Sequence, residues 1–329
     1  MGQWDASSYT SFPGGRDPRT PGAGARDGVV DPVEVLQAGQ SFVDIPLRDA
    51  VLELHPYLRR VAAYHLGLTL NARARSWELT IHPTMALLAA EATGGDPLPA
   101  LPVAVAAELA QGFWLLHEDA ADGILTRNQR PAAWVAFGLR ATLLAAQSLS
   151  ALAVETLTTA ADPRCAVAVK RLAQAQSELV RGKAQGSWLD TRADVSVEEY
   201  LEMAAHQAAL FGYSAATGAL MGSGHVPTAD ALGGLGRQLC LIHQLAVGLR
   251  AAARQPREPG AGGASARICA RLPVGRAWAR GEIRRRRSAA LDVLERIDMP
   301  ARTRDELASL TRYVAGGASE PASSSSQRD

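Results

Sequence analysis

The chain reads Phe113-Trp114-Leu115-Leu116-His117-Glu118-Asp119-Ala120-Ala121-Asp122, an apolar run that ends in three acids. The apolar half predicts a buried helix. Glu118, Asp119 and Asp122 fall on one side of that helix, because offsets of three and four share a helix face. Carboxylates grouped in this way can hold a hard divalent cation such as Mg²⁺. The pattern therefore predicts a metal site, with a solvated helix end as the alternative interpretation.

Two arginines follow these acids, in the segment Thr126-Arg127-Asn128-Gln129-Arg130-Pro131. A guanidinium group is a rigid fork of donors that matches phosphate oxygens. Acids for a metal, together with Arg127 and Arg130 for phosphate, predict a diphosphate site. A solvated surface loop is the alternative.

Most of the remaining chain has helical patterning. Its long segments are rich in Ala and Leu, with apolar residues recurring at three and four positions and no strand-like alternation. Several are apolar nearly all round, which is typical of helices inside a bundle. Ser196 and Glu199 predict a capping box at one helix start. An all-α fold is therefore predicted, with long helices over 100–118, 132–161, 164–182, 196–221 and 231–253.

Composition excludes several other classes of protein. Of 329 residues, 47% are hydrophobic but only 5% aromatic, so much of the core must be Ala, Leu and Val. The net charge of +1 gives no sign of nucleic-acid binding. We interpret the basic run 284–287 as a solvated helix face, with a phosphate or membrane-surface patch as the alternative. Three scattered cysteines, no transmembrane segment and no signal core make the cytoplasm the expected compartment.

Composition also divides the chain into three parts. Residues 1–41 are rich in Gly, Pro, Ser, Arg and Asp and predict a disordered leader. Residues 316–329, with four consecutive serines, predict a disordered tail. No internal repeat and no second core is visible between them. One domain is expected over residues 42–315.

Several landmarks line up, in order, with the trans-polyprenyl diphosphate synthases. Residues 115–131 resemble the family's first aspartate-rich region, His-Asp-Asp-x-x-Asp followed by a loop with two arginines. Residues 83–92 resemble the helix after its Gly-Lys-x-x-Arg-Pro motif, and residues 194–203 resemble the entry to its Lys-Thr helix. His243-Gln244-Leu245 resembles the Phe-Gln before its second aspartate motif. The chain is identified as a member of the polyprenyl synthetase family over about residues 44–315.

This resemblance implies a class I isoprenoid synthase, an all-α bundle of long helices around a central apolar cavity. In that family two acidic motifs hold Mg²⁺, and the metals and basic residues bind an allylic prenyl diphosphate and stabilise the departing diphosphate. Phe113 and Trp114 would floor a short pocket, with ordinary core packing as an equally supported alternative. Family members pair through their helices. A homodimer, or a heterodimer with a related synthase, is therefore expected.

The same comparison exposes departures from the family pattern. Leu79 and His82 stand where the family has the lysine and arginine that bind isopentenyl diphosphate. The acid of its Gly-Gln-x-x-Asp motif is missing from residues 182–186, where Lys183 follows the glycine. Val247 and Gly248 stand where the family has the two leading acids of its second aspartate motif. This chain cannot build the family's three-metal site, although the first acid group could still bind one or two Mg²⁺ ions weakly.

Three functions follow from this pattern of loss. The first, which we favour, is an atypical class I terpene synthase that acts on one allylic prenyl diphosphate, because the residues that bind the second substrate are replaced while the first acidic motif persists. The second is a catalytically inactive subunit that regulates an active prenyl diphosphate synthase. The third, ordinary chain elongation, is least consistent, because each lost charged contact to a diphosphate costs about 2–4 kcal/mol of transition-state stabilisation.

Overall fold

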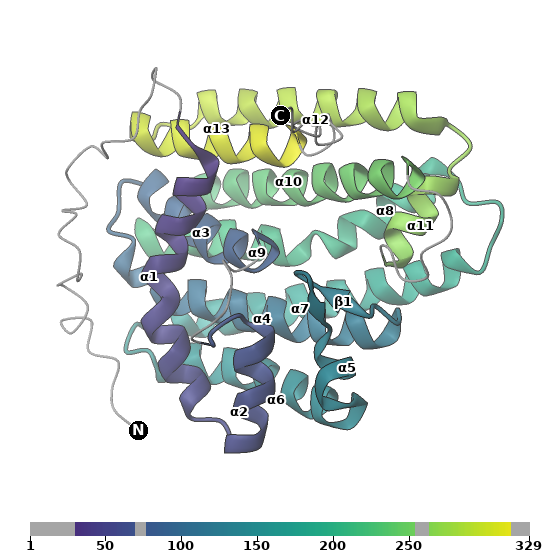
Figure 1. Ribbon diagram of the computed structural model, residues 1–329. Coiled ribbons are helices and arrows are strands. Elements are labelled where there is room, and N and C mark those ends of the chain that lie inside the picture. Colours follow the sequence, from purple (N-terminus) through teal and green to yellow (C-terminus); the bar gives the residue numbers. More distant parts are fainter. Residues whose placement is uncertain (1–29, 70–76, 254–262, 317–329) are drawn as a thin grey trace, which may run out of the picture.

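The computed structural model describes residues 30–69, 77–253 and 263–316. Helices dominate this part of the chain, and one short hairpin interrupts them (Figure 1). The elements in chain order are α1 (Pro32–Leu52), α2 (Pro56–His65), α3 (Trp77–Ala92), η2 (Leu98–Ala100), α4 (Leu101–Ala121), β1 (Thr126–Arg127), β2 (Arg130–Pro131), α5 (Ala133–Phe137), α6 (Leu139–Thr159), α7 (Cys165–Asp190), α8 (Val197–Gln207), α9 (Ala209–Gly222), α10 (Val226–Ala253), α11 (Ala264–Arg271), α12 (Gly275–Arg296) and α13 (Ala301–Gly316). The all-α prediction is confirmed.

Two central helices, α4 and α9, are buried on almost every side. α4 contacts α3 and α6, whereas α9 contacts α3 and α10, and Figure 1 shows α10 between α9 and the outer helix α12. Small residues permit this close packing: a Cβ on Gly218 of α9 would lie 2.6 Å from the Cα of Ala86 on α3. The Ala-rich composition of the chain therefore corresponds to helix crossings at short range.

One stretch of the described chain, Leu98–Ala121, has the length and composition of a membrane span. Its most apolar window is 67% buried inside the protein. The segment consists of η2 and α4, and α4 is the core helix that carries the predicted acids at its end. Its hydrophobicity is explained by its place in the bundle.

The bundle begins earlier than the sequence predicts. α1 starts at Pro32, whereas the domain was expected from residue 42. The Asp31 carboxylate accepts a hydrogen bond of 2.8 Å from the Val33 N–H, and a proline at the first helical position lacks only an N–H that no helix bond would use. The prediction of a disordered leader is thus wrong for residues 32–41, which form the start of a capped amphipathic helix. The Gly/Pro/Asp-rich composition of residues 1–41 as a whole does not indicate this helix. Residues 1–29 and 317–329 lie outside the described residues.

Two predicted helices are each split in two. Gly138, at φ +85°, separates α5 from α6, and Ala208 separates α8 from α9. The capping box is confirmed: Ser196 Oγ accepts from the Glu199 N–H, and the Glu199 carboxylate accepts from the Ser196 N–H. In the basic run on α12, Arg285 and Arg286 pair with the buried carboxylate of Glu282.

Candidate functional site

Three carboxylates gather at the C-terminal end of α4. Glu118 and Asp119 lie in its last turn, and Asp122 is the C-cap residue. A helix C-terminus carries partial negative charge, so acids there are unfavourable unless cations compensate them. In this structure each of the three carboxylates has a basic partner from another segment of the chain.

The innermost pair joins Asp119 to Arg127. Asp119 is fully buried, and both of its oxygens accept from the Arg127 guanidinium at 2.7–2.9 Å. Burial raises the pKa of Asp119 above its ordinary value, while the pair with Arg127 acts in the opposite direction. The bidentate geometry is the strong form of a charged hydrogen bond. It also fixes the start of the hairpin on the end of α4.

The hairpin places the two predicted phosphate-binding arginines opposite each other. Arg127 on β1 pairs with Arg130 on β2, and the turn residues Asn128 and Gln129 both have positive φ, as a tight hairpin turn of the mirror-image type requires. The Arg130 guanidinium lies 4.6 Å above the ring centroid of Tyr64 and donates to the Tyr64 carbonyl oxygen at 3.0 Å. The two arginines are therefore held in place by Asp119 and Tyr64.

The second pair joins Glu118 to Lys183 on α7. Two glycines set the position of α7 there: a Cβ on Gly182 would lie 2.9 Å from Cβ of His206, and one on Gly186 would lie 3.1 Å from the Met203 sulfur. α7 thus packs closely on α8. A side chain at position 186, where the family pattern has its acid, would require the Met203 side chain to shift by a few tenths of an ångström.

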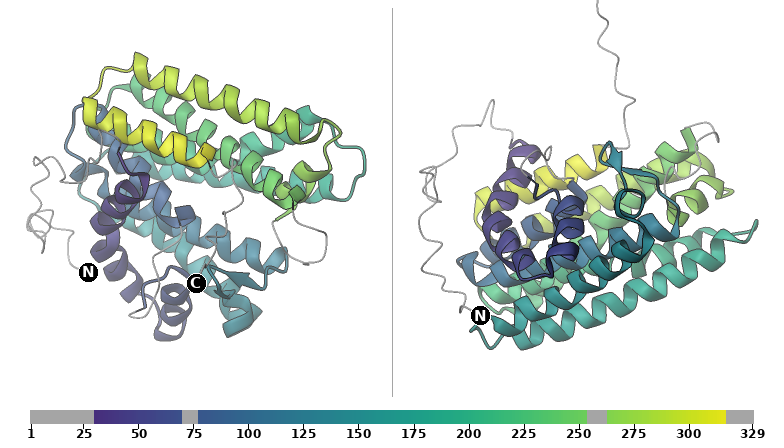
Figure 2. Two further views of the ribbon diagram at one scale, coloured as in Figure 1. Left: turned by 45° about the horizontal axis from the view of Figure 1, so that its top comes forward. Right: turned by 60° about the horizontal axis from the view of Figure 1, so that its bottom comes forward.

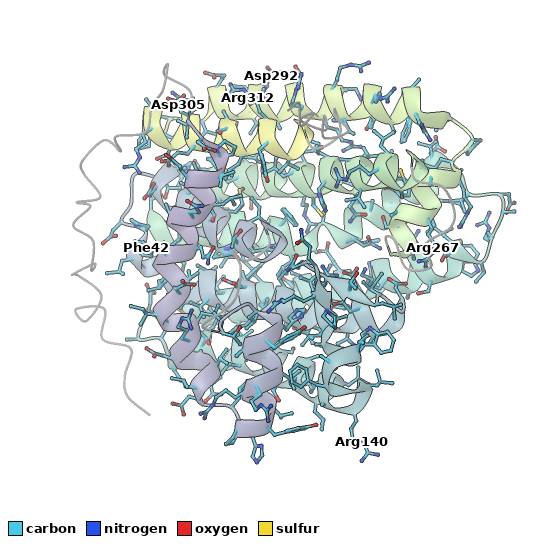
Figure 3. All side chains as sticks on the ribbon, viewed as in Figure 1. Phe42, Arg140, Arg267, Asp292, Asp305 and Arg312 are labelled. Carbon is cyan, nitrogen blue, oxygen red and sulfur yellow. The ribbon has the colours of Figure 1, made fainter. Side chains whose placement is uncertain are left out.

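The third group is a chain of alternating charges between α4, α7 and α11. Arg267 lies 3.4 Å from Asp122 and 2.7 Å from Asp190, and Arg271 lies 2.9 Å from Asp190. Figure 3 labels Arg267 on α11. Sequence reasoning missed Asp190, Arg267 and Arg271 as site residues. The available signal was the spacing of the two arginines, which puts both on one face of a short helix.

Phe113 and Trp114 lie one turn before the acids, both half-buried against the core. The Phe113 ring makes edge-to-face contacts with Trp114 and His117, at 5.0 and 4.7 Å between centroids. This packing holds the last turns of α4. The pocket role of the pair stays a prediction, as does the central cavity.

Comparison with known proteins decides the family. The model of the family described as "Polyprenyl synthetase" matches residues 80–246. The chain belongs to the polyprenyl synthetase family. It is 30% identical over 330 residues to a (2E,6E)-farnesyl diphosphate synthase of Mycobacterium tuberculosis (strain ATCC 25618 / H37Rv), a match that covers 85% of this chain and 92% of the relative. It is 36% identical over 203 residues to a geranylgeranyl diphosphate synthase of the same strain, covering 60% of this chain and 58% of that protein.

Solved structures agree with this assignment. The polyprenyl synthetase from Streptomyces coelicolor A3(2) has a TM-score of 0.74 and 29% identity, covering 86% of this chain and 99% of that chain. A geranylgeranyl pyrophosphate synthetase from the archaeon Geoglobus acetivorans shares the fold, with a TM-score of 0.72, 23% identity and coverage of 85% and 99%. The fold is the all-α class I isoprenoid synthase bundle, and the family belongs to isoprenoid biosynthesis.

Two losses from the polyprenyl synthetase pattern have a structural counterpart. His82 is buried, its Nδ1 lies 3.2 Å from the Ser214 hydroxyl, and burial lowers its pKa to about 3, so the ring is neutral at pH 7. Gly248 is covered by α11: a Cβ there would lie 2.5 Å from Cβ of Cys269. A neutral core histidine and a covered glycine thus replace an arginine and an aspartate of the family pattern.

The donor set at the end of α4 does not fit Mg²⁺. This ion requires near-octahedral oxygen ligands at about 2.0–2.1 Å. Within the described residues no three His, Cys, Asp or Glu side chains are grouped as a metal site. Glu118, Asp119 and Asp122, the predicted ligands, instead face Lys183, Arg127 and Arg267, respectively.

Proposed function

We propose that this chain acts in isoprenoid biosynthesis on a single allylic prenyl diphosphate, as an atypical terpene synthase that does not add isopentenyl diphosphate. The observation that carries the proposal is the covering of Gly248 by Cys269, supported by the neutral His82. Both changes remove charge that the two-substrate reaction of the family uses. The proposed compartment is the cytoplasm.

Basic groups near the end of α4 support the single-substrate part of the proposal. Lys183 on α7 and Arg267 on α11 pair with Glu118 and Asp122, Arg271 pairs with Asp190 next to Arg267, and Arg130 on β2 lies over the Tyr64 ring. Guanidinium forks match the oxygens of a diphosphate. Their positive charge would stabilise a departing diphosphate, and an apolar surrounding such as the residues near Phe113 would protect a carbocation from water.

The test is incubation of the protein with geranyl, farnesyl or geranylgeranyl diphosphate, each with and without isopentenyl diphosphate, followed by mass spectrometry. We expect a hydrocarbon or alcohol from one substrate alone. Arg130→Gln should lower kcat/KM about 100-fold, because one charged contact to the leaving group is lost. Arg140→Gln, on the exposed start of α6 and labelled in Figure 3, is the matched control and should leave kcat/KM unchanged. A longer diphosphate product would refute the proposal.

An inactive partner subunit is the second candidate, and an exposed apolar row favours it. Leu139, Leu143, Leu144 and Val154 on α6 are 36–53% exposed, and α6 and α7 run along an outer side of the bundle (Figure 2). Such a row is typical of an interface. This candidate predicts no turnover from the isolated chain and full activity of a co-purified synthase.

The same row predicts the site of pairing. The double variant Leu143→Glu/Leu144→Glu should convert a dimer into a monomer, because burying charged side chains against a partner is unfavourable by several kcal/mol. Light scattering after size exclusion measures the change in mass. Val226→Glu, an exposed valine at the start of α10, is the control and should leave the dimer intact. A dimer that survives the double variant would place the interface elsewhere.

A further inference from the structure

The end of α4 is organised around internal cations. Lys183 from α7 binds Glu118, and Arg267 from α11 lies between Asp122 and Asp190. These bonds join three helices that are distant in sequence, since Asp122 and Arg267 are 145 positions apart. A cross-link of this kind between an acidic helix end and its surroundings is what a divalent cation would otherwise supply.

An ammonium or guanidinium and a divalent cation compete for the same oxygens. Mg²⁺ on the Glu118 oxygen that Lys183 binds would have to displace the ammonium, which would then lie beside a second positive charge. The like-charge repulsion is large at a half-buried site, because water screens it less than at the surface. Lys183 and Arg267 are 31% and 38% exposed, so neither is screened like a fully solvated side chain.

We propose that Lys183 and Arg267 take the place of divalent metal ions at the end of α4, so that this protein holds its acidic region without Mg²⁺. This inference rests on the proposed function only for the statement that a diphosphate binds here, and its test uses no substrate. Any anionic substrate bound here would meet Lys183, Arg267 and Arg271 directly. Its binding would be independent of metal.

The sequence supports the choice of Lys183 as the deciding residue. The chain has only two lysines, Lys170 and Lys183, and one of them stands where the family motif Gly-Gln-x-x-Asp has glutamine. Gly186, which packs against Met203, stands where the same motif has the acid that could bind a metal.

Mn²⁺ titration followed by electron paramagnetic resonance tests the proposal on the full chain. The wild-type protein should bind no Mn²⁺ at this site up to about 1 mM, the weak end of the affinity range of protein cation sites. The double variant Lys183→Gln/Arg267→Gln should gain a site at least about tenfold tighter, because two carboxylates lose the cations that occupy them. Lys170→Gln, an exposed lysine of the same helix, is the matched control and should gain none.

A second readout needs no variant. The melting temperature of the wild-type protein should be the same in EDTA and in excess MgCl₂, because a ligand stabilises only the state that binds it. A shift to higher melting temperature with MgCl₂, or wild-type Mn²⁺ affinity equal to that of the double variant, would overturn the proposal. Failure of the single-substrate reaction would not overturn this proposal, since neither measurement involves a prenyl diphosphate.

Discussion

Lowering the pH from 7 to 5 is expected to remove about 4 kcal/mol from the free energy of unfolding, through His65 and His82. Both side chains are buried, at 5% and 1% exposure. The pKa of each is lowered to about 3, mainly by burial, and for His65 also by the charges of Arg127 and Arg130. Within the described residues Nε2 of neither ring has a hydrogen-bond partner. A proton added there would be an unpaired buried charge.

The sign follows from where protons bind. Below pH 6.5, the ordinary value, the unfolded chain takes up protons on these two histidines, and the folded protein does so only near pH 3. Stability is therefore fully present above pH 6.5 and is lost as the pH falls from 6.5 toward 3, by about 1.4 kcal/mol per pH unit for each histidine.

Urea unfolding at pH 7.0, 6.0 and 5.5 measures this slope. His82→Met should lower this slope by up to about 1.4 kcal/mol per pH unit, whatever its effect on stability at pH 7, because it removes one of the three histidines (His65, His82 and His243) whose pKa burial lowers to about 3. His225→Asn, at an exposed position before α10, should leave the slope unchanged. Stability that is flat between pH 7 and 5 would contradict the prediction.

Helical periodicity was sufficient to predict the architecture, but not its breaks. The apolar segments over 100–118 and 231–253 correspond to α4 and α10 within a few residues. The sequence pattern predicts continuous helices across Gly138 and Ala208, but both residues interrupt them. α1 begins inside a segment whose composition is typical of disorder. Turns and caps depend on single residues, so a pattern averaged over a window does not resolve them.

The sequence predicts the acidic residues of the candidate site but not their basic partners. The acids on α4 are local in sequence, and their spacing alone places them on one side of a helix. Their partners Lys183 and Arg267 come from α7 and α11, and nothing in the spacing of residues 113–131 predicts which side chains these helices bring. The prediction that the acids hold Mg²⁺ rests on residue types and spacing, which do not show the basic side chains that face the acids. That knowledge requires the tertiary structure.

Asp119→Asn is expected to cost about 3–5 kcal/mol of stability, because it leaves the half-buried Arg127 guanidinium without its carboxylate. The Asp119 side chain is 1% exposed and that of Arg127 18%, so solvent screens this pair little. Chemical denaturation measures the loss. Asp194→Asn, which removes an 86% exposed partner of Arg192, is the control and should leave stability nearly unchanged, because solvent screens this pair.

The same variant separates a structural carboxylate from a metal ligand. If Asp119 were an open metal ligand in the metal-free protein, removing its charge would relieve repulsion from Asp122 and from the negative end of α4, so stability would rise. If the pair with Arg127 dominates, stability falls, and the double variant Asp119→Leu/Arg127→Met should recover most of it, because an apolar pair can replace a buried ion pair at little cost. A stabilised Asp119→Asn protein would therefore return Asp119 to the metal-binding role that the sequence predicts.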